Sequence, residues 1–247
     1  MNEVDPLFLA EFLNWHLMEG NSVNTAGIDL RNIRAIFNRA ITNRLISADI
    51  YPFRDFKIPS KKTQKRSLGT TNIKTIYRAE LSGKQAQARD IFMLSFFLLG
   101  INMKDLYNLT PDNISDNRLY YDRAKTQKNY SILIYPEAKE IIERYKDGDG
   151  KRLLSFYKQY SSIYQFVKST NKFLYQFTPA LGIADKVTTY YARHSWATIA
   201  YNNGIPKDTV RLALGHGSNT VTDTYIDFDL KLVDEANQRI IDLINLD

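Results

Sequence analysis

Residues 91–99 read Ile-Phe-Met-Leu-Ser-Phe-Phe-Leu-Leu, the most apolar stretch of the chain. A helix that is apolar on every side must be buried on every side, so this segment predicts a central helix covered by other elements. It is far shorter than the roughly 20 residues that cross a bilayer. The first ten residues, MNEVDPLFLA, lack the basic segment of a signal peptide. We therefore expect a cytoplasmic protein with no membrane partner.

The composition excludes several kinds of site. The chain of 247 residues has no cysteine and only three histidines, so a disulfide scaffold, a thiolate zinc site and a histidine-rich metal cage are all excluded. Thirty-three basic residues against 27 acidic ones give a formal charge of +6. Such a surplus permits a polyanionic partner without establishing one.

The apolar spacing divides the chain into three parts. Residues 1–56 predict a small unit with one helix over 5–19, ending at Gly20, and another that follows Asn21-Ser22-Val23. Residues 57–66, KIPSKKTQKR, have five basic side chains and no acidic one, which is typical of a linker. Residues 67–247 predict a larger, mostly helical domain.

The period changes from helical to extended after Leu109. Segments 117–121 and 130–134 predict two antiparallel strands, joined by a tip that reads DRAKTQKN. The expected fold class is therefore mainly α with a small antiparallel β-hairpin or sheet.

Three short patterns could carry chemistry. They are Lys125 in the hairpin tip, Arg193-His194-Ser195-Trp196-Ala197-Thr198, and Leu214-Gly215-His216 with Tyr225 nine positions after His216. Each has an ordinary structural interpretation by itself: a solvent-exposed lysine, a salt-bridged helix face and a packing tyrosine. Their order and spacing together are more specific.

As an ordered set, these residues resemble the tyrosine recombinase (phage integrase) family, most closely the integrases of Bacteroides-type mobile elements. The resemblance implies a partial SAM-like core-binding domain over 1–56 and a catalytic domain of α+β type over 67–247. It implies a site-specific DNA recombinase that integrates or excises a mobile element through a 3′-phosphotyrosine intermediate.

The resemblance also implies a role for each matching residue. Tyr225 is the expected nucleophile, and covalent attachment lets strand exchange proceed in two reversible steps without a cofactor or metal. Arg193 and His216 are expected to bind the nonbridging oxygens of the phosphate, because charge-assisted donors stabilise the pentavalent transition state. Lys125 is the expected general acid for the departing 5′-oxygen.

Two positions depart from the family pattern. Asn102 stands where the first arginine usually lies, in Leu99-Gly100-Ile101-Asn102, and Tyr190 stands at the usual histidine of H-x-x-R. Lys104 is the nearest cation to Asn102 in sequence, but two positions along a helix it should point to another face. His194, next to Arg193, is expected to have a packing role.

The remaining basic residues predict a DNA surface, since phosphate contacts hold a protein on a duplex without reading its sequence. The expected contacts are Arg31, Arg34, Arg39, Lys61, Lys62, Lys65, Arg66, Arg123 and Lys128. Double-stranded DNA is the expected partner, with a homotetramer on DNA and a monomer without it.

A C-terminal stripe, Leu230, Val233, Ala236, Ile240 and Leu243, has helical spacing. It can pack on its own domain or dock in a neighbouring protomer, as is common in the family.

Two other functions stay open at this point. Asn102 and Tyr190 are compatible with a DNA-binding relative that has lost turnover, and a nicking-closing enzyme of the type IB topoisomerase kind would use similar residues. The N-terminal unit is short for the family, so we expect a fragment without an arm-binding domain.

Overall fold

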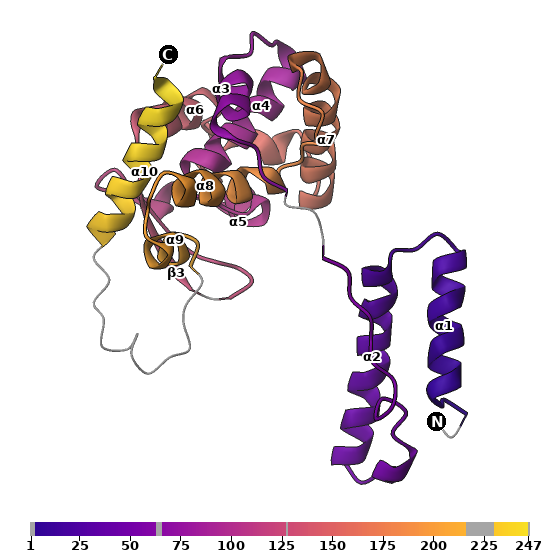
Figure 1. Cartoon of the computed structure of the whole chain (residues 1–247). Helices are drawn as coiled ribbons and strands as arrows, with labels where there is room; N and C mark the ends of the chain where they lie inside the picture. Colours follow the sequence, from indigo (N-terminus) through magenta and orange to yellow (C-terminus); the bar gives the residue numbers. More distant parts are fainter. Residues whose placement is uncertain (1–2, 63–65, 127, 216–229, 247) are drawn as a thin grey trace. The chain divides into compact units, whose positions relative to one another are not determined.

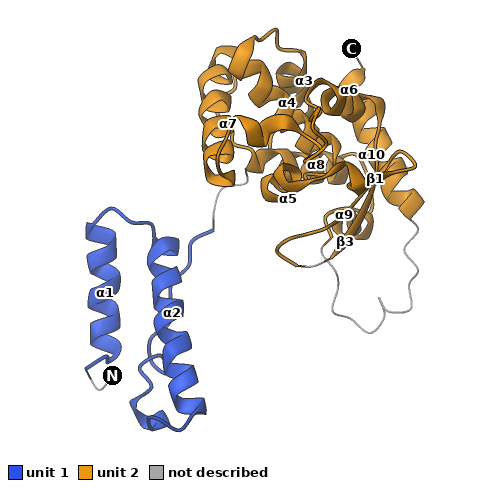
Figure 2. Cartoon of the chain, turned by 180° about the vertical axis from the view of Figure 1, so that it is seen from behind, with its two compact units in different colours: residues 1–64 blue, residues 65–247 orange. Residues whose placement is uncertain are grey.

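In a computed structural model of the protein, described for residues 3–62, 66–126, 128–215 and 230–246, the chain forms two compact units, 1–64 and 65–247 (Figure 2). Each unit has a hydrophobic core of its own. Among the described residues, no helix is both long and apolar enough to cross a membrane.

The first unit is built on two helices, α1 (Pro6–Met18) and α2 (Val23–Thr42), followed by a 3-10 turn, η1 (Ala48–Ile50) (Figure 1). Local chemistry sets the helix starts: the Asp5 carboxylate accepts from the amide of Phe8 at 2.7 Å, and Ser22 caps α2 in the same manner. The core consists of Leu9, Leu30, Phe37 and Phe53.

The predicted linker begins as part of this first unit. The side chain of Asn24 on α2 makes two hydrogen bonds with the backbone of Lys61, at 2.8 and 2.9 Å. A Cβ on Gly27 would lie 3.2 Å from the carbonyl oxygen of Pro59, so the segment runs close against α2. The 57–62 stretch is thus held against α2 by specific contacts.

The second unit is a helical domain around α4 (Gly83–Phe97), whose side chains are buried on all faces from Ile91 to Phe97. Packed against α4 are α3 (Thr70–Arg78), α6 (Pro136–Arg144), α7 (Ile163–Phe177) and α8 (Tyr190–Asn202). The remaining elements are α5 (Met103–Asn108), α9 (Lys207–Ala213), α10 (Leu230–Asn245) and the 3-10 turns η2 (Pro111–Asn113), η3 (Ser155–Lys158) and η4 (Pro179–Leu181). The central buried helix predicted from residues 91–99 is confirmed.

A small antiparallel sheet completes this unit, with strands β1 (Ile114–Ser115), β2 (Arg118–Asp122) and β3 (Asn129–Leu133) in that order. Tyr121 lies opposite Tyr130, and their rings stack with centroids 5.0 Å apart. The predicted hairpin is therefore present, and β1, too short for a periodic signal, is an addition to it. The mainly α fold class with a small antiparallel sheet is confirmed.

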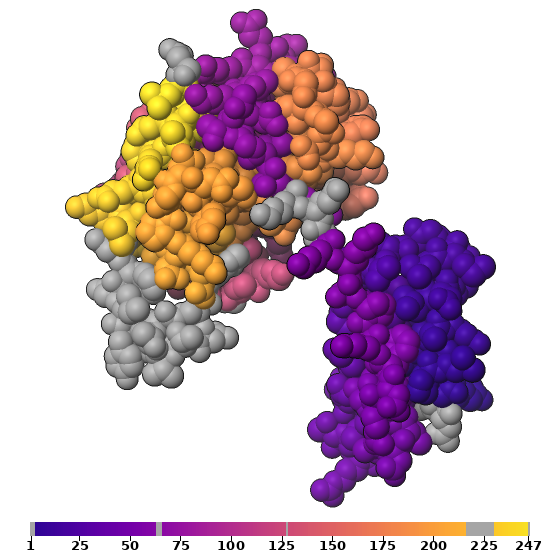
Figure 3. Space-filling model, viewed as in Figure 1, coloured from indigo at the N-terminus to yellow at the C-terminus, as the bar shows by residue number. Residues whose placement is uncertain are grey.

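Helix α10 packs on its own unit, against α3, α8, α9 and β3. In the space-filling view its yellow atoms lie against the purple atoms of α3 and the orange atoms of α8 and α9 (Figure 3). Its buried side chains are Val233, Ala236, Asn237, Ile240, Ile241 and Ile244. Of the predicted C-terminal stripe, Val233, Ala236, Ile240 and the half-buried Leu243 pack within the same chain, whereas Leu230 is exposed.

Candidate active site

A sharp turn after α4 forms the first wall of the site. Leu99 and Gly100 both have positive φ, at 56° and 72°, which ends the helix and starts α5 only three residues later. A Cβ on Gly100 would lie 2.4 Å from the Cα of Arg193, so glycine is required for the close approach of α8. This turn brings the 100–102 segment to Arg193.

Backbone carbonyls orient the Arg193 side chain. One guanidinium nitrogen donates to the carbonyl oxygen of Gly100 at 3.2 Å, and another donates to that of Leu214. The Tyr130 hydroxyl donates to the same Leu214 oxygen at 2.6 Å, and so ties β3 to the end of α9. Because a guanidinium has five N–H donors, Arg193 keeps further donors for an anion.

An aspartate anchors the hairpin tip. The buried side chain of Asp105 on α5 accepts from the backbone amide of Ala124 at 3.0 Å, through Oδ1. The amide of Arg123 donates to the carbonyl of Lys128 at 2.9 Å, and that of Thr126 donates to the carbonyl of Arg123 at 3.1 Å. These contacts place Arg123 and Lys125 at the cavity.

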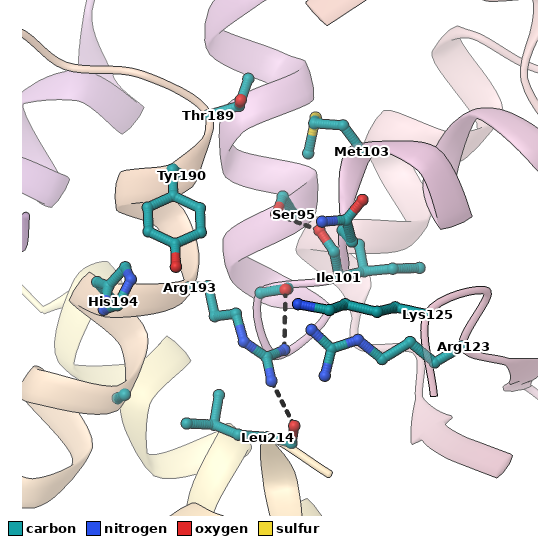
Figure 4. A pocket seen from close by; sticks show the side chains of 13 residues that line it. Ser95, Ile101, Met103, Arg123, Lys125, Thr189, Tyr190, Arg193, His194 and Leu214 are labelled. Carbon is teal, nitrogen blue, oxygen red and sulfur yellow. Dashed lines mark hydrogen bonds between the residues drawn. The ribbon is translucent and has the colours of Figure 1, made fainter. Parts of the chain in front are cut away.

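The cavity between these elements has a volume of about 320 Å³. Arg123, Lys125 and Arg193 direct their cationic ends into it (Figure 4), and none of the described residues that line it is acidic. The other lining residues are Ser95, Gly100, Ile101, Asn102, Met103, Thr189, Tyr190, His194, Ala197 and Leu214. Such a cavity is suited to bind an anion, since three cations line it and no described lining residue offsets their charge.

Asn102 lines this cavity as the N-cap of α5. Its Oδ1 accepts from the backbone amide of Lys104 at 2.9 Å, so one end of the side chain serves the helix. Lys104 is exposed and is not among the residues around the cavity. The expectation that Lys104 points elsewhere fits this arrangement.

Tyr190 and His194 form the wall opposite the hairpin. Their rings lie 4.5 Å apart between centroids, one helical turn from each other on α8. Burial lowers the pKa of the His194 imidazole below its ordinary value, and the positive charges of Arg193 and Arg66 lower it further. Sequence reasoning gave His194 a packing role, whereas its side chain reaches the cavity.

The structure brings together four of the six predicted catalytic residues, Lys125, Arg193, Tyr190 and Asn102. The other two, His216 and Tyr225, lie outside the described residues, although Leu214, two positions before His216, lines the cavity. Their roles stay predictions. Sequence reasoning missed the contribution of Tyr130 and gave Arg123 only a DNA-surface role; the basic hairpin tip was the available signal for Arg123.

The predicted DNA-binding residues lie on both units. Arg31, Arg34 and Arg39 are exposed on α2 but spread over roughly 140° of the helix, at 100° per residue. Lys61 and Lys62 are exposed at the end of the first unit, Arg66 is exposed in the second, and Lys128 is half-buried at the hairpin. Lys65 lies outside the described residues. In the described part of the chain, no cluster of three or more His, Cys, Asp or Glu side chains could hold a metal ion.

Comparisons with known proteins agree with this geometry. The sequence profile of the phage integrase family matches residues 66–231, and that of the phage integrase SAM-like domain matches residues 1–58. The chain therefore belongs to the phage integrase family of tyrosine recombinases, enzymes that cleave and transfer DNA strands. The resemblance drawn from the ordered motifs is confirmed.

Individual relatives are distant in sequence and similar in fold. The chain is 21% identical over 243 residues to tyrosine recombinase XerC of Thermodesulfovibrio yellowstonii, covering 93% of this chain and 79% of that protein. A Tn1549 transposon integrase in complex with a circular intermediate DNA matches with a TM-score of 0.69 and 16% identity, covering 97% of this chain and 86% of the other. A lambda integrase tetramer bound to a Holliday junction matches with a TM-score of 0.66 and 18% identity, covering 93% and 67%.

Proposed function

We propose that this chain is a site-specific recombinase that cleaves DNA with Tyr225 and rejoins it to a new partner strand. The observation that carries the proposal is the convergence of Lys125 and Arg193 on one cavity without acidic lining residues. These two residues come from a hairpin tip and a helix 68 positions apart in sequence. A phosphodiester is the anion that this family cleaves, and the family match covers residues 66–231 of the second unit.

The expected chemistry uses only side chains of the protein. The Tyr225 phenolate attacks phosphorus after its proton has passed to solvent, and a bond forms between the phenolic oxygen and phosphorus. The bond from phosphorus to the 5′-oxygen breaks, and Lys125 supplies the proton that this oxygen takes up. Arg193 and His216 neutralise the two nonbridging oxygens, where negative charge accumulates. The reverse sequence on a new 5′-hydroxyl reseals the strand.

Assembly follows from the same proposal. We infer a homotetramer on double-stranded DNA and a monomer without it, acting in the cytoplasm on the ends of a mobile element. Support comes from the fold shared with a lambda integrase tetramer on a Holliday junction and with a transposon integrase. Because Val233, Ala236 and Ile240 of α10 are buried within their own chain, these side chains are not available to join free monomers.

A second candidate, a DNA-binding relative without turnover, has one observation in its favour. Asn102 brings no charge to the cavity, and its Oδ1 is committed to capping α5. Such a protein would bind the same DNA and form no covalent adduct.

The test uses a nicked duplex that carries the end sequence of the encoding element, so that a released fragment diffuses away and the covalent adduct accumulates. Wild-type protein should form the adduct, while Tyr225→Phe should form none and bind DNA with unchanged affinity. The matched control is Tyr201→Phe, which removes an exposed hydroxyl from α8 and should leave the adduct in place.

Three outcomes would contradict the proposal. Binding without adduct by the wild-type protein would favour the non-catalytic relative. An adduct that persists in Tyr225→Phe would assign the nucleophile elsewhere. Relaxation of supercoiled plasmid with no strand exchange between two substrates would favour a topoisomerase of type IB.

A further inference from the structure

The cavity lacks a positive charge at the position of the family's first arginine. Arg193 and Lys125 occupy the positions that the motifs predict, but Asn102 leaves the place of the first arginine without a cation. A neutral amide can donate a hydrogen bond to a phosphate oxygen, yet it cannot offset the added negative charge of the transition state. Full activity would therefore require a cation from another element.

We propose that Arg123, on the β2–β3 hairpin, is a catalytic residue that binds the scissile phosphate and replaces the missing arginine. This inference rests on the proposed function. It assigns to Arg123 a contact with a nonbridging oxygen, in place of a contact with the DNA backbone away from the reaction.

Position is the first argument. Arg123 lines the same cavity as Lys125 and Arg193, and the three cationic ends converge in Figure 4. Burial and the nearby Tyr130 and Asp105 raise the pKa of the Tyr121 hydroxyl, and the charges of both Arg193 and Arg123 oppose that rise. Both guanidinium groups therefore act on one buried tyrosine, which lies one pair from the hairpin tip.

Lack of a counter-charge is the second argument. The ion pairs found among the described residues do not include Arg123, Lys125 or Arg193. Three cations that line one cavity, with no acidic residue in its described lining and no ion pair of their own, repel one another, and a phosphate bound among them relieves that repulsion. The half-buried Arg89 and Arg118 each pair with an aspartate, whereas the half-buried Arg152 donates to the carbonyl of Tyr107 and the side chain of Asn108.

Anchoring is the third argument, because a catalytic cation must be held in place before the reaction. The backbone of Arg123 takes part in two hydrogen bonds of the turn, with Lys128 and Thr126. The next residue, Ala124, is fixed to the buried Asp105. The guanidinium thus extends from a defined turn and needs little reorganisation to meet a phosphate.

The alternative cation is excluded by its placement. Lys104 is the nearest basic residue to Asn102 in sequence, but it is exposed and lies outside the cavity lining. Its amide, which donates to Asn102, fixes it in the first turn of α5. Lys104→Gln changes the formal charge by the same amount as Arg123→Gln and is therefore a matched control.

The experiment measures single-turnover adduct formation on the nicked duplex, with DNA affinity measured separately. Arg123→Gln should slow adduct formation by about 10²–10³-fold, as for the loss of one donor to a transition-state oxyanion. Arg123→Lys should recover part of the rate because it restores the charge without the planar fork. Lys104→Gln should keep the wild-type rate, and DNA affinity should fall by less than roughly tenfold in all three variants.

A substrate with a methylphosphonate at the scissile position separates catalysis from hairpin placement. This group lacks the negative charge of one nonbridging oxygen, so the difference between wild type and Arg123→Gln should shrink to a few-fold. A defect of equal size on both substrates would mean that Arg123 only holds the hairpin, and would overturn the inference.

The failures of the two proposals can be told apart. An active wild type with an equally active Arg123→Gln variant overturns the role of Arg123 and leaves the recombinase function standing. A wild type that forms no adduct overturns both.

Discussion

Asn237 on α10 links three helices of the catalytic unit through its side chain. The side chain is buried, its Oδ1 accepts from the indole Nε1 of Trp196 on α8 at 2.9 Å, and its Nδ2 donates to the carbonyl of Phe97 at the end of α4 at 2.9 Å. Both partners are buried as well. Tyr225, the expected nucleophile, precedes α10 by only five residues. The packing of α10 is therefore expected to affect the position of Tyr225.

Replacing Asn237 with leucine, a side chain of similar size, removes both hydrogen bonds and leaves the Trp196 N–H and the Phe97 carbonyl unpaired. Each buried polar group left without a partner costs about 1–3 kcal/mol, so we expect a loss of about 3 kcal/mol after the gain from the added apolar contacts. In a unit of this size, a loss of about 1 kcal/mol in the free energy of unfolding lowers Tm by roughly 2–4 °C, so we expect Tm to fall by about 6–12 °C.

Differential scanning calorimetry can follow the transition of the catalytic unit. Gln238→Leu serves as the control: that amide donates to Asp242 in an exposed hydrogen bond, and its loss should change stability by less than about 0.5 kcal/mol. In a Trp196→Phe background the indole donor is already absent, so Asn237→Leu should cost about 1 kcal/mol less than in the wild-type background. Strict additivity of the two substitutions, or a Tm unchanged by Asn237→Leu, would refute the reasoning.

Two further predictions concern the site itself. Gly100→Ala should abolish adduct formation and lower Tm by several degrees, because a Cβ at this position, with φ at +72°, would lie 2.4 Å from Arg193. Gly69→Ala is the control and should have neither effect, because there is open space around the new methyl group. An active Gly100→Ala enzyme would contradict the close approach of Gly100 to Arg193. The His194 pKa is lowered by burial and by Arg193 and Arg66, so the folded protein binds fewer protons at His194 than the unfolded chain does. Its share of stability is therefore complete above the unfolded pKa of about 6.5 and declines as pH falls below that value. Proton NMR should show His194 titrating below the ordinary histidine value of about 6.5, and His194→Gln should flatten the decline of stability as the pH falls below that value.

Much of the fold follows from local pattern. The apolar side chains of residues 91–99 require burial in any fold, and the pattern at 117–121 and 130–134 predicted the two strands that the structure has at 118–122 and 129–133. Asp5, Ser22 and Gly20 mark helix ends through hydrogen bonds and backbone angles that involve only near neighbours. Short elements such as β1, with two residues, have no period to detect, since they exist only because β2 is there to pair with.

The order of Lys125, Arg193, Leu214-Gly215-His216 and Tyr225 along the chain was enough to indicate the family, because spacing is a property of sequence alone. What each cation faces is a property of the folded chain. Lys104 is the neighbour of Asn102 in sequence, yet the helix turns it away, while the hairpin brings Arg123 to the cavity from 21 positions further on. The C-terminal stripe is a similar case: its apolar side requires a partner surface, and only the packing of α10 on α3, α8 and α9 decided that the surface belongs to the same chain. Periodicity specifies which side of an element must be covered, whereas long-range packing specifies what covers it.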